Sequence, residues 1–366
     1  MKFVKYITAV LSLTLLNTTI ASKRNNNQPV QQKLIPDKAT LAEKHFNVGI
    51  SFLELNKYQE AIENFDLTIK YNSNCAEAYY NKGICLLELG QYQEAIESYN
   101  LAIKYNPNYA KAYNNKGVCL GKLGQYQEAI ENYDLAIKYN PNYGDAYYNK
   151  GVCLGKLGQY QEAIESYNLA IKYNPNYAKA YNNKGVCLYE LGQYQEAIES
   201  YNLAIKYKPD YAKAYHNKGV SLAELGQFQE AIESYNLAIK YNPNNSDAYY
   251  NKGVCLGKLG QYQEAIESYN LAIKYNPNDS DAYYNKGNCL YELGQYQEAI
   301  ESYNLAIKYN PNYGDAYYNK GVCLDKLGQF QEAIESCNLA IKYDPNNVEA
   351  YKLINILKQE IADIKK

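Results

Sequence analysis

The sequence contains few of the side chains from which catalytic and metal sites are built. Its 366 residues include only two histidines, His45 and His216, which lie far apart, and no tryptophan. No Cys-x-x-Cys pair occurs, whereas a catalytic or zinc site needs several reactive groups that converge. Carboxylate pairs such as Glu162 and Glu165 recur along the chain on a face expected to be solvated, so none is a unique acid–base pair. The sequence therefore predicts no enzyme, no metal site and no cofactor.

An excess of basic charge is also lacking. The 37 Lys and Arg residues are matched by 39 Asp and Glu residues, which gives a formal net charge of −2. Surfaces that bind nucleic acids are usually basic patches that neutralise phosphates. A nucleic-acid partner is therefore disfavoured, including RNA bound by a helical repeat.

The main apolar run is short and lies near the N-terminus. Residues 7–16 are mostly apolar, follow Lys2 and Lys5, and precede small and polar residues that end at Ala21. This layout is typical of a secretory signal peptide, and the run is too short to span a hydrocarbon core of about 30 Å. We expect residues 1–21 to be a signal peptide and the protein to be periplasmic or secreted, without a stable transmembrane anchor. Residues 22–41 are polar and are expected to be a flexible linker.

The rest of the chain is one 34-residue unit repeated in a fixed register. Nine copies are expected in residues 42–347, namely 42–75, 76–109, 110–143, 144–177, 178–211, 212–245, 246–279, 280–313 and 314–347. We number the positions of each copy from 1 to 34. Within the fourth copy, apolar residues recur at helical spacing over residues 146–157 and again over 160–171, which predicts two amphipathic helices. Gly158 and Pro175 lie where the helices should end, and the small residues Gly151 and Ala163 are expected to let the two helices approach closely.

This pattern resembles the tetratricopeptide repeat. The residues that match are Tyr147, Gly151, Ala163, Tyr167, Ala170 and Pro175. The sequence departs from the family at position 11, which is leucine or phenylalanine, and at position 7, where copies two to nine have lysine in place of leucine. The stem of this lysine must lie over apolar neighbours while its amine reaches water. The resemblance implies an all-α, right-handed α-solenoid of antiparallel helix pairs, whose concave groove holds an extended peptide or a partner's helix. It implies a non-catalytic scaffold with a protein or peptide partner.

Two sets of residues on the first helix of each copy are candidates for that groove. Position 6 is asparagine in every copy, and a row of amides can hydrogen-bond to both the N–H and the C=O groups of a peptide. The row is similar to the asparagine ladder of O-linked N-acetylglucosamine transferase; alternatively, asparagine is simply common here in the family. The candidate amides are Asn47, Asn81, Asn115, Asn149, Asn183, Asn217, Asn251, Asn285 and Asn319. Alanine at Asn149, Asn183 and Asn217 is expected to weaken binding and to leave thermal unfolding unchanged.

Position 5 is expected to supply selectivity for side chains, because tyrosines on a rigid helix are good binding anchors. The candidates are Tyr80, Tyr148, His216, Tyr250, Tyr284 and Tyr318, with Asn114 and Asn182 in two copies. A clamp for a C-terminal carboxylate, found in some family members, needs lysine at position 5 and arginine at position 6. Neither occurs here, so that role is disfavoured.

Nine cysteines in an exported protein raise the question of disulfides. Seven of them occupy position 10, and equivalent residues in neighbouring copies should lie about 8–10 Å apart, whereas a disulfide needs Cα atoms within about 7 Å. We interpret these seven as buried small hydrophobic residues, with Cys337 also in the core. Cys75, between copies one and two, is the one expected to be reactive.

The two ends of the array should differ from its interior, because terminal repeats expose a face to water. Copy one is degenerate, and residues 348–366 are expected to form a capping helix over the last copy. The alternative to a peptide-binding scaffold is a structural array whose copies stack end to end, so self-association is the second hypothesis.

Overall fold

The computed structural model describes residues 37–364, and the expected signal peptide and most of the expected linker lie outside this range. The described residues form nineteen helices and no strand. Their bounds are α2 Lys38–Glu54, α3 Tyr58–Tyr71, α4 Ala76–Glu88, α5 Tyr92–Tyr105, α6 Ala110–Lys122, α7 Tyr126–Tyr139, α8 Gly144–Lys156, α9 Tyr160–Tyr173, α10 Ala178–Glu190, α11 Tyr194–Tyr207, α12 Ala212–Glu224, α13 Phe228–Tyr241, α14 Ser246–Lys258, α15 Tyr262–Tyr275, α16 Ser280–Glu292, α17 Tyr296–Tyr309, α18 Gly314–Lys326, α19 Phe330–Tyr343 and α20 Val348–Ile364.

The first helix begins earlier than the repeat register suggests. We expected the linker to extend to residue 41, but α2 begins at Lys38. Asp37 is the reason, because its carboxylate accepts a hydrogen bond of 2.7 Å from the backbone N–H of Thr40 and so caps the helix.

Each helix pair is closed by a turn that requires a left-handed residue. In the fourth copy Gly158 has a φ of 75°, and the equivalent glycines of copies two to nine all have positive φ. Copy one has Asn56 there, with a φ of 58°, and asparagine tolerates this conformation better than most residues. The turn therefore survives in the degenerate first copy without glycine.

Close packing within each pair of copies one to eight involves a glycine and an aromatic ring, whereas in copy nine Gly321 meets Cys337. A Cβ atom added to Gly151 would lie 2.7 Å from Cε1 of Tyr167, a fully buried ring of the second helix. Ala163 is also buried, but the side chain that lies against Gly151 is this tyrosine. Gly151 was expected to let the two helices approach closely, and the structure shows that it does so by making room for a large ring.

The cysteines at position 10 are buried and unpaired, as the spacing argument predicted. All nine cysteines are free, and all but Cys75 are buried. Burial raises the pKa of Cys153 to about 11, which keeps the thiol protonated. Cys75 is only partly exposed and its pKa is also raised, mainly by burial, so the reactivity expected of it is not supported.

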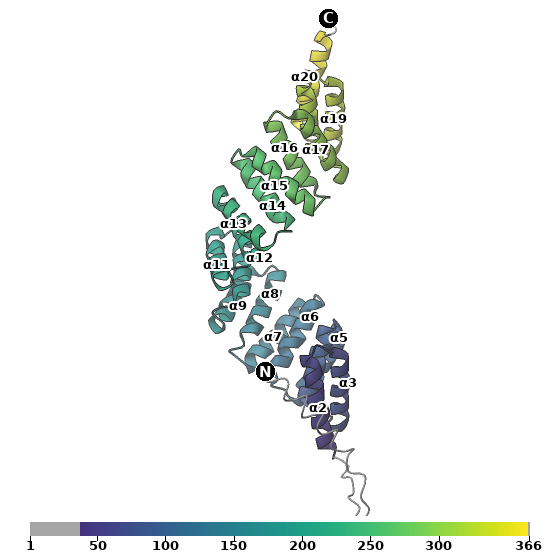
Figure 1. Cartoon of the computed structure of the whole chain (residues 1–366), viewed down its shortest axis with the longest axis vertical. Coiled ribbons are helices and arrows are strands. Elements are labelled where there is room, and N and C mark those ends of the chain that lie inside the picture. The colour runs from purple at the N-terminus through teal and green to yellow at the C-terminus, as the bar shows by residue number, and fades with distance from the viewer. Residues whose placement is uncertain (1–36, 365–366) are drawn as a thin grey trace, which may run out of the picture.

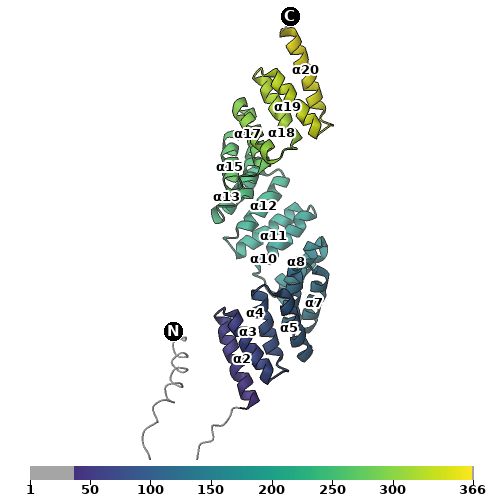
Figure 2. The same cartoon turned by 90° about the vertical axis from the view of Figure 1, so that its right-hand side faces the viewer.

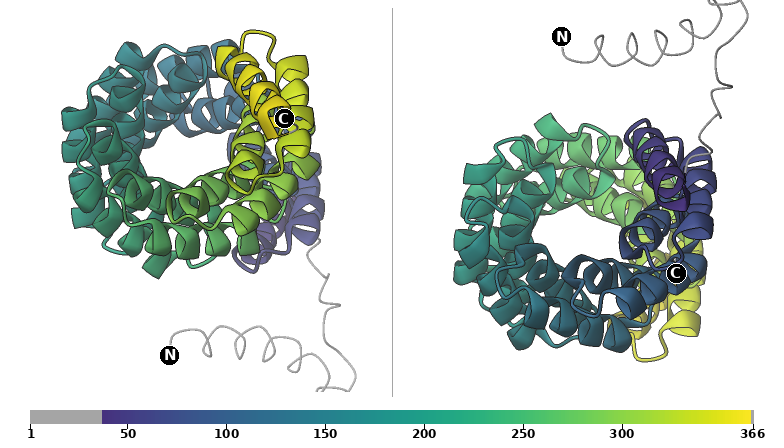
Figure 3. Two further views of the ribbon diagram at one scale, coloured as in Figure 1. Left: turned by 90° about the horizontal axis from the view of Figure 1, so that it is seen from above. Right: turned by 90° about the horizontal axis from the view of Figure 1, so that it is seen from below.

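The helix pairs stack into an open spiral (Figures 1 and 2). Viewed along the long axis, the helices are arranged in a ring, and the two ends of the array lie on the same side of it (Figure 3). The first helices of successive copies, such as α8 and α10, contact one another, but no two successive second helices do within residues 37–364. In a curved stack the inner elements are closest together, so the even-numbered helices line the concave side and the odd-numbered helices the convex side.

Both ends of the array carry polar residues at positions that are buried inside it. In α2, Lys44 and Ser51 are exposed where the inner copies have buried alanine and, in seven of the eight, buried cysteine. In α20, Asn355 and Lys358 are exposed where the inner copies bury glycine and leucine. The opposite face of α20 packs on α19 through Ala350, Ile354 and Leu357. These polar ends oppose end-to-end stacking of the array.

Candidate functional site: the concave surface

The candidate asparagines lie on the concave helices but are joined to the preceding copy. The side-chain amide nitrogens of Asn115, Asn183, Asn285 and Asn319 donate to the hydroxyls of Tyr80, Tyr148, Tyr250 and Tyr284 at 3.1–3.3 Å. Those of Asn149 and Asn217 donate to the side-chain oxygens of Asn114 and Asn182 at 3.1 Å. Position 6 of one copy is therefore bonded to position 5 of the copy before it. We call this row of bonds the amide ladder.

The amide ladder changes what we expect of alanine substitutions. A hydrogen bond of this kind contributes about 1 kcal/mol to stability. Alanine at Asn149, Asn183 and Asn217 would remove three of them, so thermal unfolding should not stay unchanged, contrary to the expectation from sequence. The ladder bonds use the amide hydrogens as donors. The groups that remain for a ligand, among the described residues, are therefore mainly hydrogen-bond acceptors, for example the amide oxygens of Asn149 and Asn285.

The position-5 tyrosines pack into the wall of the groove. The rings of Tyr80, Tyr148 and Tyr284 each lie 4.8 Å from the last tyrosine of the same copy, between centroids. Each side chain is half-buried, and its hydroxyl accepts the ladder bond. The first role of these tyrosines is therefore structural. The sequence did not reveal this role, because the asparagine that bonds to each tyrosine lies 35 residues away.

Three candidate amides stand outside the ladder, and one of them, Asn47, belongs to copy one, which has no copy before it. The position-5 residue in the copy before Asn81 is Phe46, whose side chain has no hydrogen-bond acceptor. The amide of Asn81 donates to the backbone oxygen of Glu77 instead. The position-5 residue in the copy before Asn251 is His216, and Asn251 has no hydrogen bond among the described residues. Nδ1 of His216 is buried without a partner, and its ring meets that of Tyr235 edge-on at 5.7 Å. The ladder is interrupted between copies six and seven.

Replacing His216 with Asn should close this interruption. Burial lowers the pKa of His216 from its ordinary 6.5, with Asp247 opposing the shift and Lys213 adding to it. Because the unfolded chain binds the proton more tightly, His216 costs stability as the pH falls below about 6.5. We expect His216→Asn to stabilise the array by about 1 kcal/mol at pH 7.5, and by more at pH 5.5. Thermal unfolding at both values tests this, with His45→Asn as the control; an equal gain from His45→Asn would contradict it.

A hollow of about 430 Å³ opens on the concave side between α16 and α18. Tyr318, Asn319 and Glu292 are among its lining residues. Tyr318 is the one position-5 tyrosine whose hydroxyl has no ladder partner among the described residues, because the equivalent of asparagine in α20 is Leu353. The hydroxyl of Tyr318 is therefore left unbonded at this hollow among the described residues.

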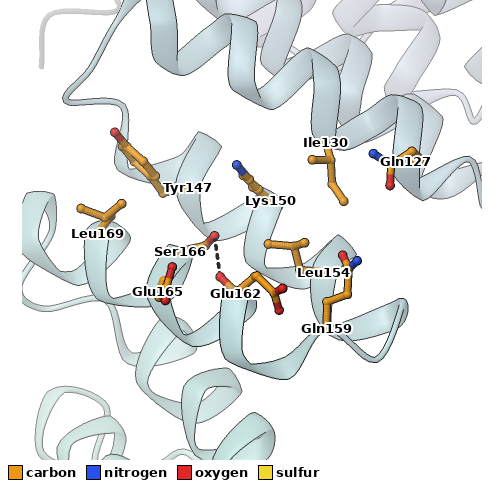
Figure 4. Close-up of a pocket in the computed structure, with 10 residues that line it drawn as sticks. All are labelled: Gln127, Ile130, Tyr147, Lys150, Leu154, Gln159, Glu162, Glu165, Ser166 and Leu169. Atoms are coloured by element: carbon orange, nitrogen blue, oxygen red, sulfur yellow. Dashed lines mark hydrogen bonds between the residues drawn. The ribbon is translucent and has the colours of Figure 1, made fainter.

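The convex side has a shallower kind of hollow between successive second helices. Between α7 and α9 it has an apolar floor that includes Ile130 and Leu154 (Figure 4). Lys150, at the divergent position 7, lies at this hollow and its amine pairs with Asp134 of the preceding copy at 2.6 Å. The lysine stem is thus partly buried while the amine meets a charge partner at the surface.

Residues 37–364 contain no group of three or more His, Cys, Asp or Glu side chains able to hold a metal ion. In the same range, no helix is both long and apolar enough to cross a bilayer.

Sequence models of the tetratricopeptide repeat match nearly all copies of the array. The matches cover residues 48–112, 110–143, 144–177, 166–199, 187–226, 221–260, 246–279, 280–313 and 314–347. The chain belongs to the tetratricopeptide repeat family. Membership of this family and the α-solenoid architecture support a protein-interaction scaffold. A search of curated proteins finds no significant match.

Several solved structures resemble parts of the array. One is YrrB, described as having an unusual peptide-binding site, with 27% identity over 52% of this chain and 97% of its own, at a TM-score of 0.48. MamA from Desulfovibrio magneticus RS-1 is 25% identical over 46% of this chain and 96% of its own, at 0.44. PilF from Pseudomonas aeruginosa is 16% identical over 56% of this chain and 94% of its own, at 0.50, a likeness of fold alone.

Proposed function

We propose that this tetratricopeptide repeat protein is a non-catalytic scaffold that binds an extended segment of a partner protein along its concave surface. The observation that carries the proposal is the row of position-6 amides on successive concave helices, with several amide oxygens left unpaired. An extended backbone presents N–H donors at regular intervals, which suits such a row of acceptors. The amide ladder supports this role by fixing each amide before a ligand arrives, which reduces the entropy lost on binding.

Stacking of arrays end to end is the weaker alternative. It requires apolar terminal faces, whereas Lys44 and Ser51 are exposed on one terminal helix, and Asn355 and Lys358 on the other. We also propose that the scaffold works outside the cytoplasm, on the strength of the signal-peptide pattern in residues 1–21, and fractionation of the source cells would test this.

Asn251 offers the sharpest test of binding, because its amide makes no bond within the array. We would select 12-residue peptides that bind the full chain from a random displayed library and measure their affinity by fluorescence anisotropy. Asn251→Ala should weaken a selected peptide about three- to tenfold, the loss of one or two hydrogen bonds, and leave thermal unfolding unchanged. Asn285→Ala is the matched control in the ladder and should lower stability as well. Failure to select any peptide, or affinity unaffected by either change, would overturn the proposal.

A further inference from the structure

The hollow between α16 and α18 differs from every other site on the concave surface because of one residue. Position 9 is valine or isoleucine in the other copies, but Asn288 in copy eight. The side-chain oxygen of Asn288 accepts two hydrogen bonds, from the hydroxyl of Tyr303 at 2.9 Å and from the amide of Asn319 at 3.0 Å. Its amide nitrogen also donates toward the hydroxyl of Tyr284, which opposes the rise in the pKa of that tyrosine, and this leaves one amide hydrogen as a donor at the hollow.

Two aromatic rings in the hollow carry free hydroxyls. Tyr291 is held by Tyr296, with 5.5 Å between ring centroids. Its counterpart in copy five, Tyr189, hydrogen-bonds to Glu224 of the next copy at 3.3 Å, but the residue equivalent to Glu224 is here Lys326, which cannot accept. The hydroxyl of Tyr318 is free for the reason given above. The ring of Tyr291 is thus held in place, whereas Tyr318 has no ring contact among the described residues because copy nine has Cys337 and Asn347 where other copies have tyrosines.

The charge at the hollow is negative. Glu292 lines it and forms no ion pair among the described residues, and no basic side chain contributes to the lining. The exposed acids Asp281, Asp315 and Glu349 follow the N-terminal ends of α16, α18 and α20 at position 2. Lys352 pairs with Glu349 at 2.8 Å, and of these two charges Glu349 has the larger effect on the pKa of Tyr318, while Lys326 lies at a different hollow beside Asp325 and Glu360.

We propose that this hollow binds one lysine or arginine side chain of the segment held in the groove. Aromatic rings attract a cation, a free carboxylate pairs with it, and a volume of about 430 Å³ is within the range of ordinary ligand pockets. The remaining amide hydrogen of Asn288 is placed to hold a carbonyl of the same segment. This inference rests on the proposed function. The position-6 amides are the same in every copy and cannot select a partner side chain, so the inference assigns that selectivity to copies eight and nine.

The test compares Glu292→Gln with Glu190→Gln, its counterpart in copy five. We would select peptides from the random library on the wild-type chain and on both variants. Wild type and Glu190→Gln should enrich lysine or arginine at one fixed peptide position, and Glu292→Gln should not. Changing that basic residue to glutamine in a selected peptide should weaken binding to wild type about tenfold, and binding to Glu292→Gln much less.

The outcomes separate this inference from the function on which it rests. Selected peptides without an enriched basic position, or enrichment that survives in Glu292→Gln, would overturn the basic pocket and leave the groove intact. If no peptide is selected on any of the three chains, the proposed function itself falls. Asn288→Val, which restores the residue of the other copies, should lower affinity for the selected peptide without unfolding α16; unchanged affinity would contradict the role of Asn288.

Discussion

Replacing Gly151 with alanine should destabilise the fourth copy by roughly 1–3 kcal/mol, although alanine is the better helix former by about 1 kcal/mol. The added Cβ would lie 2.7 Å from Cε1 of Tyr167 and 3.0 Å from Cδ1 and Cζ. That ring is buried and cannot move aside without opening the core. The cost of overpacking therefore exceeds the gain in helix propensity.

Gly155, one turn later in the same helix, is the matched control. A Cβ there would meet only the sulfur of Cys187 at 3.7 Å, which is ordinary contact, so Gly155→Ala should stabilise the copy by roughly 0.5–1 kcal/mol. Hydrogen exchange in α8 and α9 measures both effects locally, which matters because a long repeat array does not unfold in two states. Stabilisation by both alanines would show that Tyr167 does not pack on Gly151.

Deleting residues 348–366 should have the second large effect, on both the stability of copy nine and its solubility. α20 buries Ile354 and Leu357, and a fully buried side chain of this kind contributes about 1.5–3 kcal/mol. Leu357 takes the place of the position-10 cysteine, while Cys337 takes the place of the preceding tyrosine ring, and both are fully buried. Leu357 is larger than the cysteine that it replaces, and Cys337 is smaller than the tyrosine that it replaces, so the two changes offset each other in volume. This match ties α20 to copy nine.

We expect the shortened chain to lose several kcal/mol of protection in α18 and α19 and to associate as its concentration rises. Light scattering over a concentration series and hydrogen exchange report the two effects. Replacing the exposed Tyr351 and Ile356 of α20 with glutamine is the control and should change neither. A shortened chain that stays monomeric with full protection would mean that α20 is not a cap.

The sequence was sufficient to predict the helix pairs, because the periodicity of the apolar residues is repeated in every copy. It also predicted the face that lines the concave side, through the family resemblance. It missed the early start of α2, although Asp37 followed by Thr40 is a capping signal that could have been recognised. It missed the ring that fills the space beside Gly151, since spacing within one helix does not identify a neighbour on another.

The amide ladder could not be derived from the pattern of one helix. Its bonds join position 6 of one copy to position 5 of the copy before, so the pair is visible only once the stacking is known. One signal was present: position 5 varies among tyrosine, asparagine and histidine, all of which can accept a hydrogen bond. Two of the interruptions, Phe46 before Asn81 and Leu353 after Tyr318, lie at the two ends of the array, and the third, between His216 and Asn251, lies inside it.

The most direct measurement of the central claim is the affinity of one selected peptide for two triple variants of the full chain. One variant replaces three glycines at position 12, on the concave side, with tyrosine: Gly121, Gly155 and Gly257. Copies five and eight already have tyrosines at this position, Tyr189 and Tyr291, so the fold accepts the ring there. The other changes Leu101, Leu169 and Leu237, exposed on the second helices, to glutamine. If the concave surface is the binding site, the first variant loses at least tenfold in affinity and the second binds like wild type. Loss of affinity in the second variant alone would show that partners bind the convex side.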